Sequence, residues 1–174
     1  MITLSTNITI ATEKDIPALN MLVNNAYRGE GSKKGWTTEA DLLDGTRTDE
    51  TGLQELLKDP EAVILKYTVE EKLQACVYLK KKHTKLYLGM LTVSPELQAK
   101  GIGKQLLTAA ENYAKQLGCG SITMTVISIR HELIAWYERH GYYPTGETEP
   151  FPVSARFSTP RLPLEFIVME KELK

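Results

Sequence analysis

Hydrophobic and polar positions alternate along the chain with two different periods, which predicts a mixture of strands and helices. A period of two places side chains on opposite faces of a strand, and a period near 3.6 forms an apolar stripe along a helix. Strands are predicted at 8–11, 62–69, 73–80, 85–93, 121–127, 142–149 and 164–170. Helices are predicted at 16–27, 37–43, 53–57, 102–117 and 130–140.

This order of elements predicts a mixed α/β fold, with one sheet and helices on both of its faces. Residues 91–127 read as a strand, a helix and a strand, a unit whose crossover should be right-handed. The 174 residues contain no internal repeat and no linker. A single domain over residues 1–174 is therefore the simplest expectation.

Composition and charge mainly exclude functions. The formal net charge is −1 and the only basic cluster is 80–82, predicted to be an exposed hairpin tip, so no nucleic-acid partner is expected. No apolar run is long enough for a membrane span, and the N-terminus does not resemble a signal peptide. The two cysteines are expected to be buried and reduced, which favours a cytoplasmic protein. The three histidines are too scattered to suggest a metal site.

The most specific chemistry lies between residues 91 and 107, where a β-branched run is followed by a Pro-containing turn and a long helix. The helix opens with Gln98-Ala-Lys-Gly101-Ile-Gly103. A helix N-terminus offers unpaired N–H groups and a dipole that favours an anion, and glycines allow close approach to the backbone. The segment therefore predicts a pyrophosphate site. A dinucleotide-binding loop would need an acidic residue at the next strand end, where 119–121 reads Cys-Gly-Ser, and no Gly-Lys-Ser/Thr indicates a Walker loop.

A second segment, Leu133-Ile-Ala-Trp-Tyr137-Glu-Arg-His-Gly141-Tyr142, reads as a helix that carries a tyrosine and ends at a glycine and an aromatic residue. Taken together, the two segments resemble the acetyl-CoA site and second motif of the GNAT superfamily of N-acetyltransferases. The resemblance covers roughly residues 7–172. It implies a mostly antiparallel sheet of about seven strands flanked by about four helices, with a splayed strand pair that binds CoA.

The resemblance also implies an acetyl-CoA co-substrate, no metal, and direct transfer in a ternary complex. Tyr137 would protonate the leaving thiolate, and a main-chain N–H near Leu91 or Thr92 would polarise the acetyl carbonyl. Arg130 stands where the family often has Asn, so it could instead reach a phosphate or an acidic substrate, or simply begin a helix. The cofactor-binding residues implied are Leu91, Thr92, Val93, Gln98, Ala99, Lys100, Gly101, Ile102, Gly103 and Lys104.

The acceptor side is implied to come from residues 27–47 and 151–161. The candidate residues from these segments comprise four aromatic rings, one acid and two arginines, a set that suggests a small polar or zwitterionic amine, although Trp36 and Arg47 have an equally good structural explanation. The strand ending at Val93 lacks the carboxylate that many relatives use as a base, which leaves Glu39, Tyr87 or a water chain. The candidate acceptor residues are Tyr27, Trp36, Thr37, Glu39, Arg47, Phe151, Arg156 and Phe157.

Three alternatives stay open. A non-catalytic acyl-CoA-binding or regulatory module would keep the pocket without the reaction, and a protein or peptide amine could replace the small molecule as acceptor. Residues 150–163 hold four prolines and could cross to a second copy, so a homodimer is also open.

Overall fold

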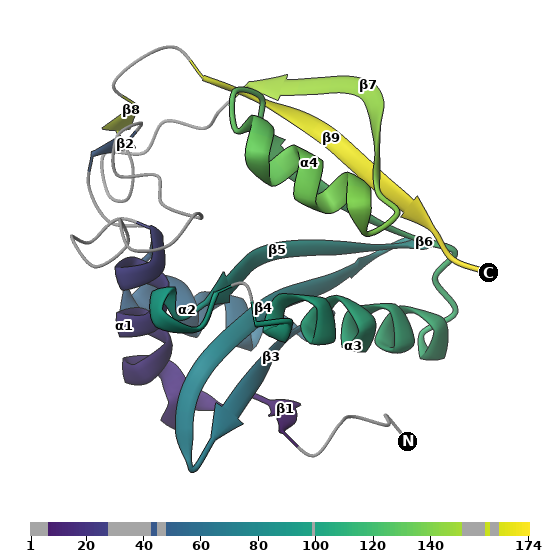
Figure 1. Cartoon of the computed structure of the whole chain (residues 1–174). Helices are drawn as coiled ribbons and strands as arrows, with labels where there is room; N and C mark the ends of the chain where they lie inside the picture. Colours follow the sequence, from purple (N-terminus) through teal and green to yellow (C-terminus); the bar gives the residue numbers. More distant parts are fainter. Residues whose placement is uncertain (1–6, 28–42, 45–47, 99, 151–158, 161–163) are drawn as a thin grey trace.

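The computed structural model describes residues 7–27, 43–44, 48–98, 100–150, 159–160 and 164–174 (Figure 1). Two 3₁₀ turns, Glu13–Asp15 and Pro95–Leu97, precede the helices α1 and α3. The strands and helices, in chain order, are β1 (Ile8–Ile10), α1 (Ile16–Tyr27), β2 (Leu43–Asp44), α2 (Glu50–Lys58), β3 (Ala62–Val69), β4 (Lys72–Lys82), β5 (Lys85–Val93), α3 (Ile102–Gln116), β6 (Ser121–Ile127), α4 (His131–Arg139), β7 (Tyr143–Pro150), β8 (Thr159–Pro160) and β9 (Glu165–Glu172).

One seven-stranded sheet organises the molecule, in the order β1-β3-β4-β5-β6-β9-β7. Its neighbouring strands are antiparallel except β5 and β6, which are parallel and joined through α3. Together with four α-helices in the described part of the chain, this confirms the predicted mixed α/β fold. The strands β2 and β8 form a separate antiparallel pair.

The buried side chains divide into two clusters, one on each face of the sheet. One cluster joins α3 and α4 to the sheet and includes Leu106, Tyr113 and Tyr137. The other joins α1 and α2 to the opposite face and includes Leu19 and Leu53. Figure 1 shows α3 and α4 lying on the same side of the sheet. The sheet therefore separates a face covered by α3 and α4 from a face covered in part by α1 and α2.

Two predicted helices differ from the structure. The helix α2 begins at Glu50 instead of residue 53, because the Asp49 carboxylate accepts a hydrogen bond of 2.7 Å from the Gly52 N–H and caps the helix. Leu43, predicted to end a helix, lies in β2 opposite Pro160. Residues 37–42 of that predicted helix lie outside the described residues.

The basic run at 80–82 is part of β4 and not a hairpin tip, because β4 continues to Lys82. The Lys80 ammonium forms an ion pair of 2.7 Å with the Asp59 carboxylate, and this contact raises the pKa of Lys80. The turn itself is at His83 and Thr84, where His83 has a φ of 58°. Because successive side chains of a strand point to opposite faces, these three lysines do not form one charged patch.

Candidate active site

The parallel strands β5 and β6 pair over only three rungs and then separate. Their last rung joins Tyr87 to Thr123, yet β5 continues to Val93 and β6 to Ile127. The resulting fork is the splayed strand pair that the resemblance implied. We call the paired end of β5 and β6 the closed end of the fork, and the end at Val93 and Ile127 its mouth.

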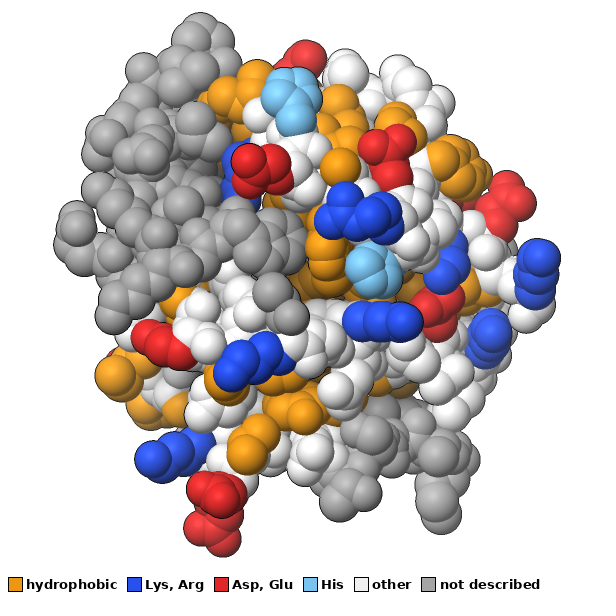
Figure 2. Space-filling model, in the orientation of Figure 1, with side chains coloured by type: hydrophobic (Ala, Val, Ile, Leu, Met, Phe, Trp, Pro, Cys, Tyr) orange, Lys and Arg blue, Asp and Glu red, His pale blue; other side chains and the backbone are white. Residues whose placement is uncertain are grey.

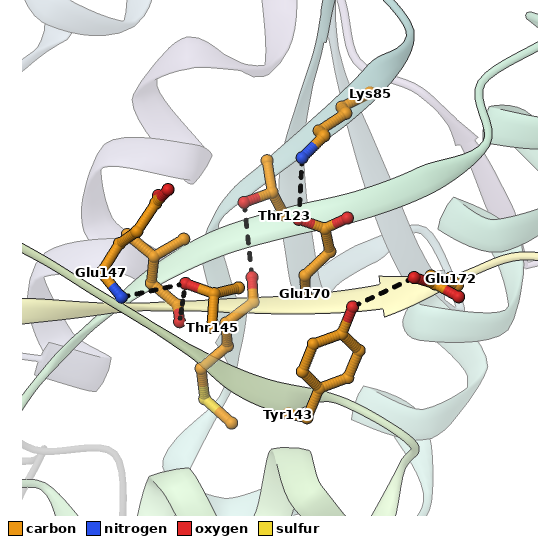
Figure 3. A network of polar contacts seen from close by, with 9 residues as sticks. Lys85, Thr123, Tyr143, Thr145, Glu147, Glu170 and Glu172 are labelled. Atoms are coloured by element: carbon orange, nitrogen blue, oxygen red, sulfur yellow. Dashed lines mark hydrogen bonds and ion pairs between the residues drawn. The ribbon is translucent and has the colours of Figure 1, made fainter.

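Polar contacts across three strands fix the closed end of the fork. Figure 3 shows Lys85 of β5 reaching across β6 to Glu170 of β9, an ion pair of 2.9 Å. The Thr123 hydroxyl donates a hydrogen bond of 3.4 Å to the Met169 carbonyl. On the neighbouring strand β7, the Tyr143 hydroxyl donates to a Glu172 carboxylate oxygen at 3.3 Å. These contacts therefore hold β5 and β6 together at the closed end, from which the two strands separate toward the mouth.

A β-bulge in β5 turns this strand away from β6. Gly89 pairs with Tyr78 and Thr92 pairs with Cys76, so Met90 and Leu91 together face a single residue of β4. Met90 has a φ of 53°, a left-handed conformation that is uncommon for a side chain of its size. A bulge bends its strand and shifts by one residue which side chains face the core. The regular strand predicted at 85–93 did not include this bulge.

Thr92 clamps the bulge from within. Its side chain is completely buried, and its hydroxyl donates a hydrogen bond of 2.8 Å to the Met90 carbonyl. The Cys76 thiol lies 3.9 Å from the same carbonyl oxygen. Two side chains thus hold the carbonyl of the strained residue, which is how a costly backbone conformation persists in a folded protein.

Removing this clamp should weaken the donor site. The substitution Thr92→Val keeps the shape but deletes the donor, and we expect kcat/KM for acetyl-CoA to fall about tenfold, with about 1–2 kcal/mol of unfolding free energy lost. Thr92→Ser keeps the hydroxyl and should stay within about threefold of the parent in kcat/KM. Steady-state kinetics and urea unfolding measure both effects. An unchanged kcat/KM in Thr92→Val would show that the clamp does not shape the site.

The predicted phosphate loop lies at the mouth of the fork. The Gln98 side chain donates a hydrogen bond of 3.0 Å to the Val93 carbonyl and so ties the loop to the end of β5. Gly101 is the N-cap of α3 with a φ of 83°, and a Cβ there would meet no atom within 4 Å. The first helical hydrogen bond runs from the Gln105 N–H to the Gly101 carbonyl. The N–H groups of residues 102–104 therefore precede the helical ladder and are available to an anion.

Basic side chains flank this loop. Lys100 and Lys104, on either side of Gly101, are exposed. Figure 2 shows Lys, Arg and His side chains between α3 and α4, with acidic side chains among them. At the loop itself the two lysines supply positive charge that fits a phosphate ligand, although the whole chain has a net charge of −1.

Tyr137 projects from α4 into the buried cluster that also contains Leu91, Val93 and Ile102. It is 6% exposed, and its ring makes edge contacts with the rings of Trp136 at 5.1 Å and Tyr142 at 5.7 Å between centroids. The structure therefore brings the candidate acid into the same cluster as the end of β5 and the start of α3.

The start and end of α4 are set by different contacts. Arg130 is the N-cap, and its carbonyl accepts a hydrogen bond of 3.0 Å from the Ile134 N–H, while its side chain is partly buried. At the other end, the Lys171 ammonium donates to the His140 carbonyl at 2.9 Å and pairs with the Glu111 carboxylate at 2.7 Å. These two contacts tie the C-terminus of α4 to α3 and β9.

Tyr142, just after α4, carries a buried hydroxyl with no hydrogen-bond partner among the described residues. The side chain is 3% exposed. Burial raises the pKa of its phenol, and the Glu111 carboxylate raises it further. Tyr142 is therefore neutral at physiological pH, and its hydroxyl is a net cost to stability.

On the opposite face of the sheet, Tyr87 stands at the last paired rung of the fork. A Cβ on Gly89 would lie 3.0 Å from Cε1 and 3.3 Å from the hydroxyl oxygen of Tyr87, so the ring leans along β5 toward the mouth. Tyr78, which packs against the cluster of α1 and α2, meets the Tyr87 ring edge-on at 6.3 Å. Tyr87 thus faces away from α3 and α4.

Most predicted acceptor residues lie outside the described part of the chain, so their roles stay predictions. Tyr27 ends α1, but its side chain lies outside the description. Ala99 of the predicted cofactor loop also lies outside it. The acceptor residues that fall outside are Trp36, Thr37, Glu39, Arg47, Phe151, Arg156 and Phe157.

The described residues also bear on metal binding, membrane crossing and the state of the cysteines. In the described ranges, no group of three or more His, Cys, Asp or Glu side chains could hold a metal ion. No helix in those ranges has the length and apolar character that a membrane crossing requires. Cys76 and Cys119 are both buried and free.

The fork, the glycine loop and the buried tyrosine define an acetyl-CoA-dependent acyltransferase. A sequence model described as the acetyltransferase (GNAT) family matches residues 22–142, and the chain belongs to this family. None of the curated proteins with which the sequence was compared matches it.

Solved structures share the fold at low sequence identity. The ribosomal-protein-S18-alanine N-acetyltransferase of Escherichia coli is 15% identical with a TM-score of 0.72, over 96% of this chain and 93% of that one. A ribosomal-protein-alanine N-acetyltransferase of Brucella melitensis is 20% identical with a TM-score of 0.70, over 95% and 99%. A structure described as a streptothricin acetyltransferase of Bacillus anthracis, in complex with acetyl coenzyme A, is 18% identical with a TM-score of 0.58. The match covers 69% of this chain and 67% of that one.

Proposed function

We propose that the protein transfers an acetyl group from acetyl-CoA to a primary amine of a small polar molecule, by direct attack in a ternary complex. The fork between β5 and β6 carries this proposal, because the glycine loop and Tyr137 lie on one face and Tyr87 faces the other. We also propose that residues 1–174 form one domain, since one sheet contains both β1 and β9, the first and last described strands. The free buried cysteines suit a reducing compartment, so we place it in the cytoplasm.

The donor would bind across the mouth of the fork. Its pyrophosphate would accept hydrogen bonds from the N–H groups at residues 102–104, with Lys100 and Lys104 adding positive charge. The pantetheine arm would run between the separated strands, beside the main chain of residues 91–93. Gln98 would hold the loop against β5 through its hydrogen bond to Val93.

The reaction needs three events at the acetyl group. The amine lone pair attacks the carbonyl carbon, and a main-chain N–H at Leu91 or Thr92 stabilises the oxyanion that forms. The carbon–sulfur bond then breaks, and Tyr137 donates its phenolic proton to the departing thiolate. The amine loses its own proton to a base or to water. No covalent enzyme intermediate is required.

The proposed class of acceptor is inferred from the sequence. The candidate acceptor residues within 27–47 and 151–161 combine aromatic rings with Glu39, Arg47 and Arg156, a set that suits a small polar or zwitterionic amine. Two of the proteins with a similar fold are named for ribosomal-protein alanine, so a protein or peptide amine is the alternative acceptor. A homodimer through residues 150–163 stays a prediction that sedimentation equilibrium would check.

We propose that Tyr87, a candidate base, contacts the acceptor, because its ring faces away from α3 and α4. Tyr87→Phe removes only its hydroxyl, so we expect kcat/KM for the acceptor to fall about tenfold while KM for acetyl-CoA changes less than about twofold. Initial rates at varied concentrations of each substrate separate the two effects. A rise in KM for acetyl-CoA with unchanged acceptor kinetics would place Tyr87 on the donor side and contradict this assignment.

A thiol-release assay tests the proposed function directly. The purified chain is mixed with acetyl-CoA and a panel of small polar amines, amino acids and peptides with free N-termini or lysines. Turnover with a small amine supports the proposal, and turnover with peptides alone would replace the acceptor class. Binding of CoA by calorimetry without turnover on any acceptor would instead indicate the non-catalytic module.

A further inference from the structure

We infer that Trp136 is a positioning residue that holds the first turn of α3 at a fixed distance from Tyr137, and that Gly103 is glycine to make room for it. The inference rests on the proposed function, because it assigns the α3 turn to the phosphates and Tyr137 to the thiolate. It changes the role predicted for Gly103, which the sequence analysis assigned to close approach of the phosphates.

The two glycines of the loop have different surroundings. A Cβ on Gly103 would lie 3.2 Å from Cζ2 and 3.3 Å from Cη2 of Trp136, and 3.9 Å from a methyl carbon of Val93. A Cβ on Gly101 would meet nothing within 4 Å. Gly103 is therefore the point where β5, α3 and α4 touch, whereas Gly101 faces open space.

Trp136 has little freedom to move away from this contact. Its indole contacts the His140 ring at 4.3 Å between centroids with the two planes tilted by 39°, and Tyr137 meets it edge-on at 5.1 Å. The Nδ1 of His140 lies 2.7 Å from the Trp136 carbonyl oxygen. Because a carbonyl only accepts, Nδ1 carries the proton, and this hydrogen bond fixes the imidazole beside the indole.

An added methyl group at residue 103 would therefore displace functional groups. Contacts of 3.2 and 3.3 Å are tighter than a methyl group normally makes with an aromatic ring, so the indole must give by a few tenths of an ångström, and because it is held on both sides the α3 turn or α4 moves with it. A shift of the turn moves the N–H groups that meet the pyrophosphate. A shift of α4 moves Tyr137, which follows Trp136 directly in the chain.

The test is a double-mutant cycle in the full chain, with Gly103→Ala, Trp136→Phe and both together. We expect Gly103→Ala to weaken coenzyme A binding and raise KM for acetyl-CoA about tenfold, and to lower kcat about threefold. Trp136→Phe shortens the indole to a phenyl ring and leaves a gap against the α3 turn, so KM for acetyl-CoA should rise about fivefold. The double variant should bind coenzyme A no more weakly than Trp136→Phe alone, because the smaller ring leaves space for the methyl group.

Calorimetry with coenzyme A and steady-state kinetics give the readouts, and thermal midpoints check folding. Gly120→Ala is the matched control, since a Cβ there would meet nothing within 4 Å and φ is not left-handed; its affinity should equal that of the parent. If Gly103→Ala weakens binding equally with Trp or Phe at 136, the methyl group obstructs the ligand itself and the inference fails. A parent chain that binds no coenzyme A would instead overturn the proposed function.

Discussion

Replacing Tyr137 by Phe should lower kcat about a hundredfold while KM for acetyl-CoA changes less than about threefold. The substitution deletes only the phenolic hydroxyl, which we propose as the proton donor to the thiolate. The ring contacts with Trp136 and Tyr142 would remain, so the packing of α4 should be preserved. Stopped-flow or steady-state thiol release with a saturating acceptor measures kcat.

Tyr142→Phe is the matched control for this experiment. The ring of Tyr142 lies 5.7 Å from that of Tyr137, but its buried hydroxyl has no partner in the described part of the chain. We expect kcat to stay unchanged and the free energy of unfolding to rise by about 1 kcal/mol. If Tyr137→Phe retains the parent kcat, the thiolate leaves without help from this residue.

The elements of the sheet were predictable because local signals agree with the fold. The strands β3, β5 and β6 have the predicted bounds, and glycine stands just before β6 and just after α3. The apolar stripe on α3 marks the side chains that are buried, including Leu106 and Ala110. Such signals lie within a few residues of the element they define, so one sequence suffices to read them.

The bulge in β5 is visible in which side chains of the strand are buried, although the expected alternation of the strand did not predict it. Leu86 and Leu88 alternate as expected, but the next buried pair that joins the same cluster is Leu91 and Val93. Met90 lies in the opposite cluster, so the alternation slips by one residue just after Gly89. A slip of this kind in an otherwise regular strand predicts a bulge.

The partner of Gly103 could not be predicted in the same way. Gly-x-Gly at a helix start has two explanations, close approach of a ligand or close approach of another element, and local sequence does not separate them. Trp136 comes from a different helix, and the contact exists only once α3 and α4 pack on the same face. The fork itself was expected only through the family resemblance, since no local pattern states where two parallel strands stop pairing.

Gly101, by contrast, should support phosphate binding in two ways. Its backbone adopts a left-handed conformation, and its lack of a side chain leaves space for the pyrophosphate. Gly101→Val places a β-branched residue at a φ of 83° and directs a side chain into the open space before α3. In the free variant the loop would relax from the left-handed conformation, so binding must restore it at a cost of about 1–2 kcal/mol, and obstruction of the pyrophosphate adds a similar amount. A loss of about 3 kcal/mol corresponds to roughly a hundredfold higher Kd for coenzyme A.

Gly118→Val separates the two contributions, because Gly118 ends the same helix with a φ of 76° and equally open surroundings. It carries the same backbone strain at the opposite end of α3, so it should lower the free energy of unfolding and leave the Kd for coenzyme A unchanged. Calorimetry and urea unfolding of the two variants give the comparison. Equal affinities in Gly101→Val and Gly118→Val would mean that residue 101 does not meet the phosphates, and the pyrophosphate would then have to bind away from the N-terminus of α3.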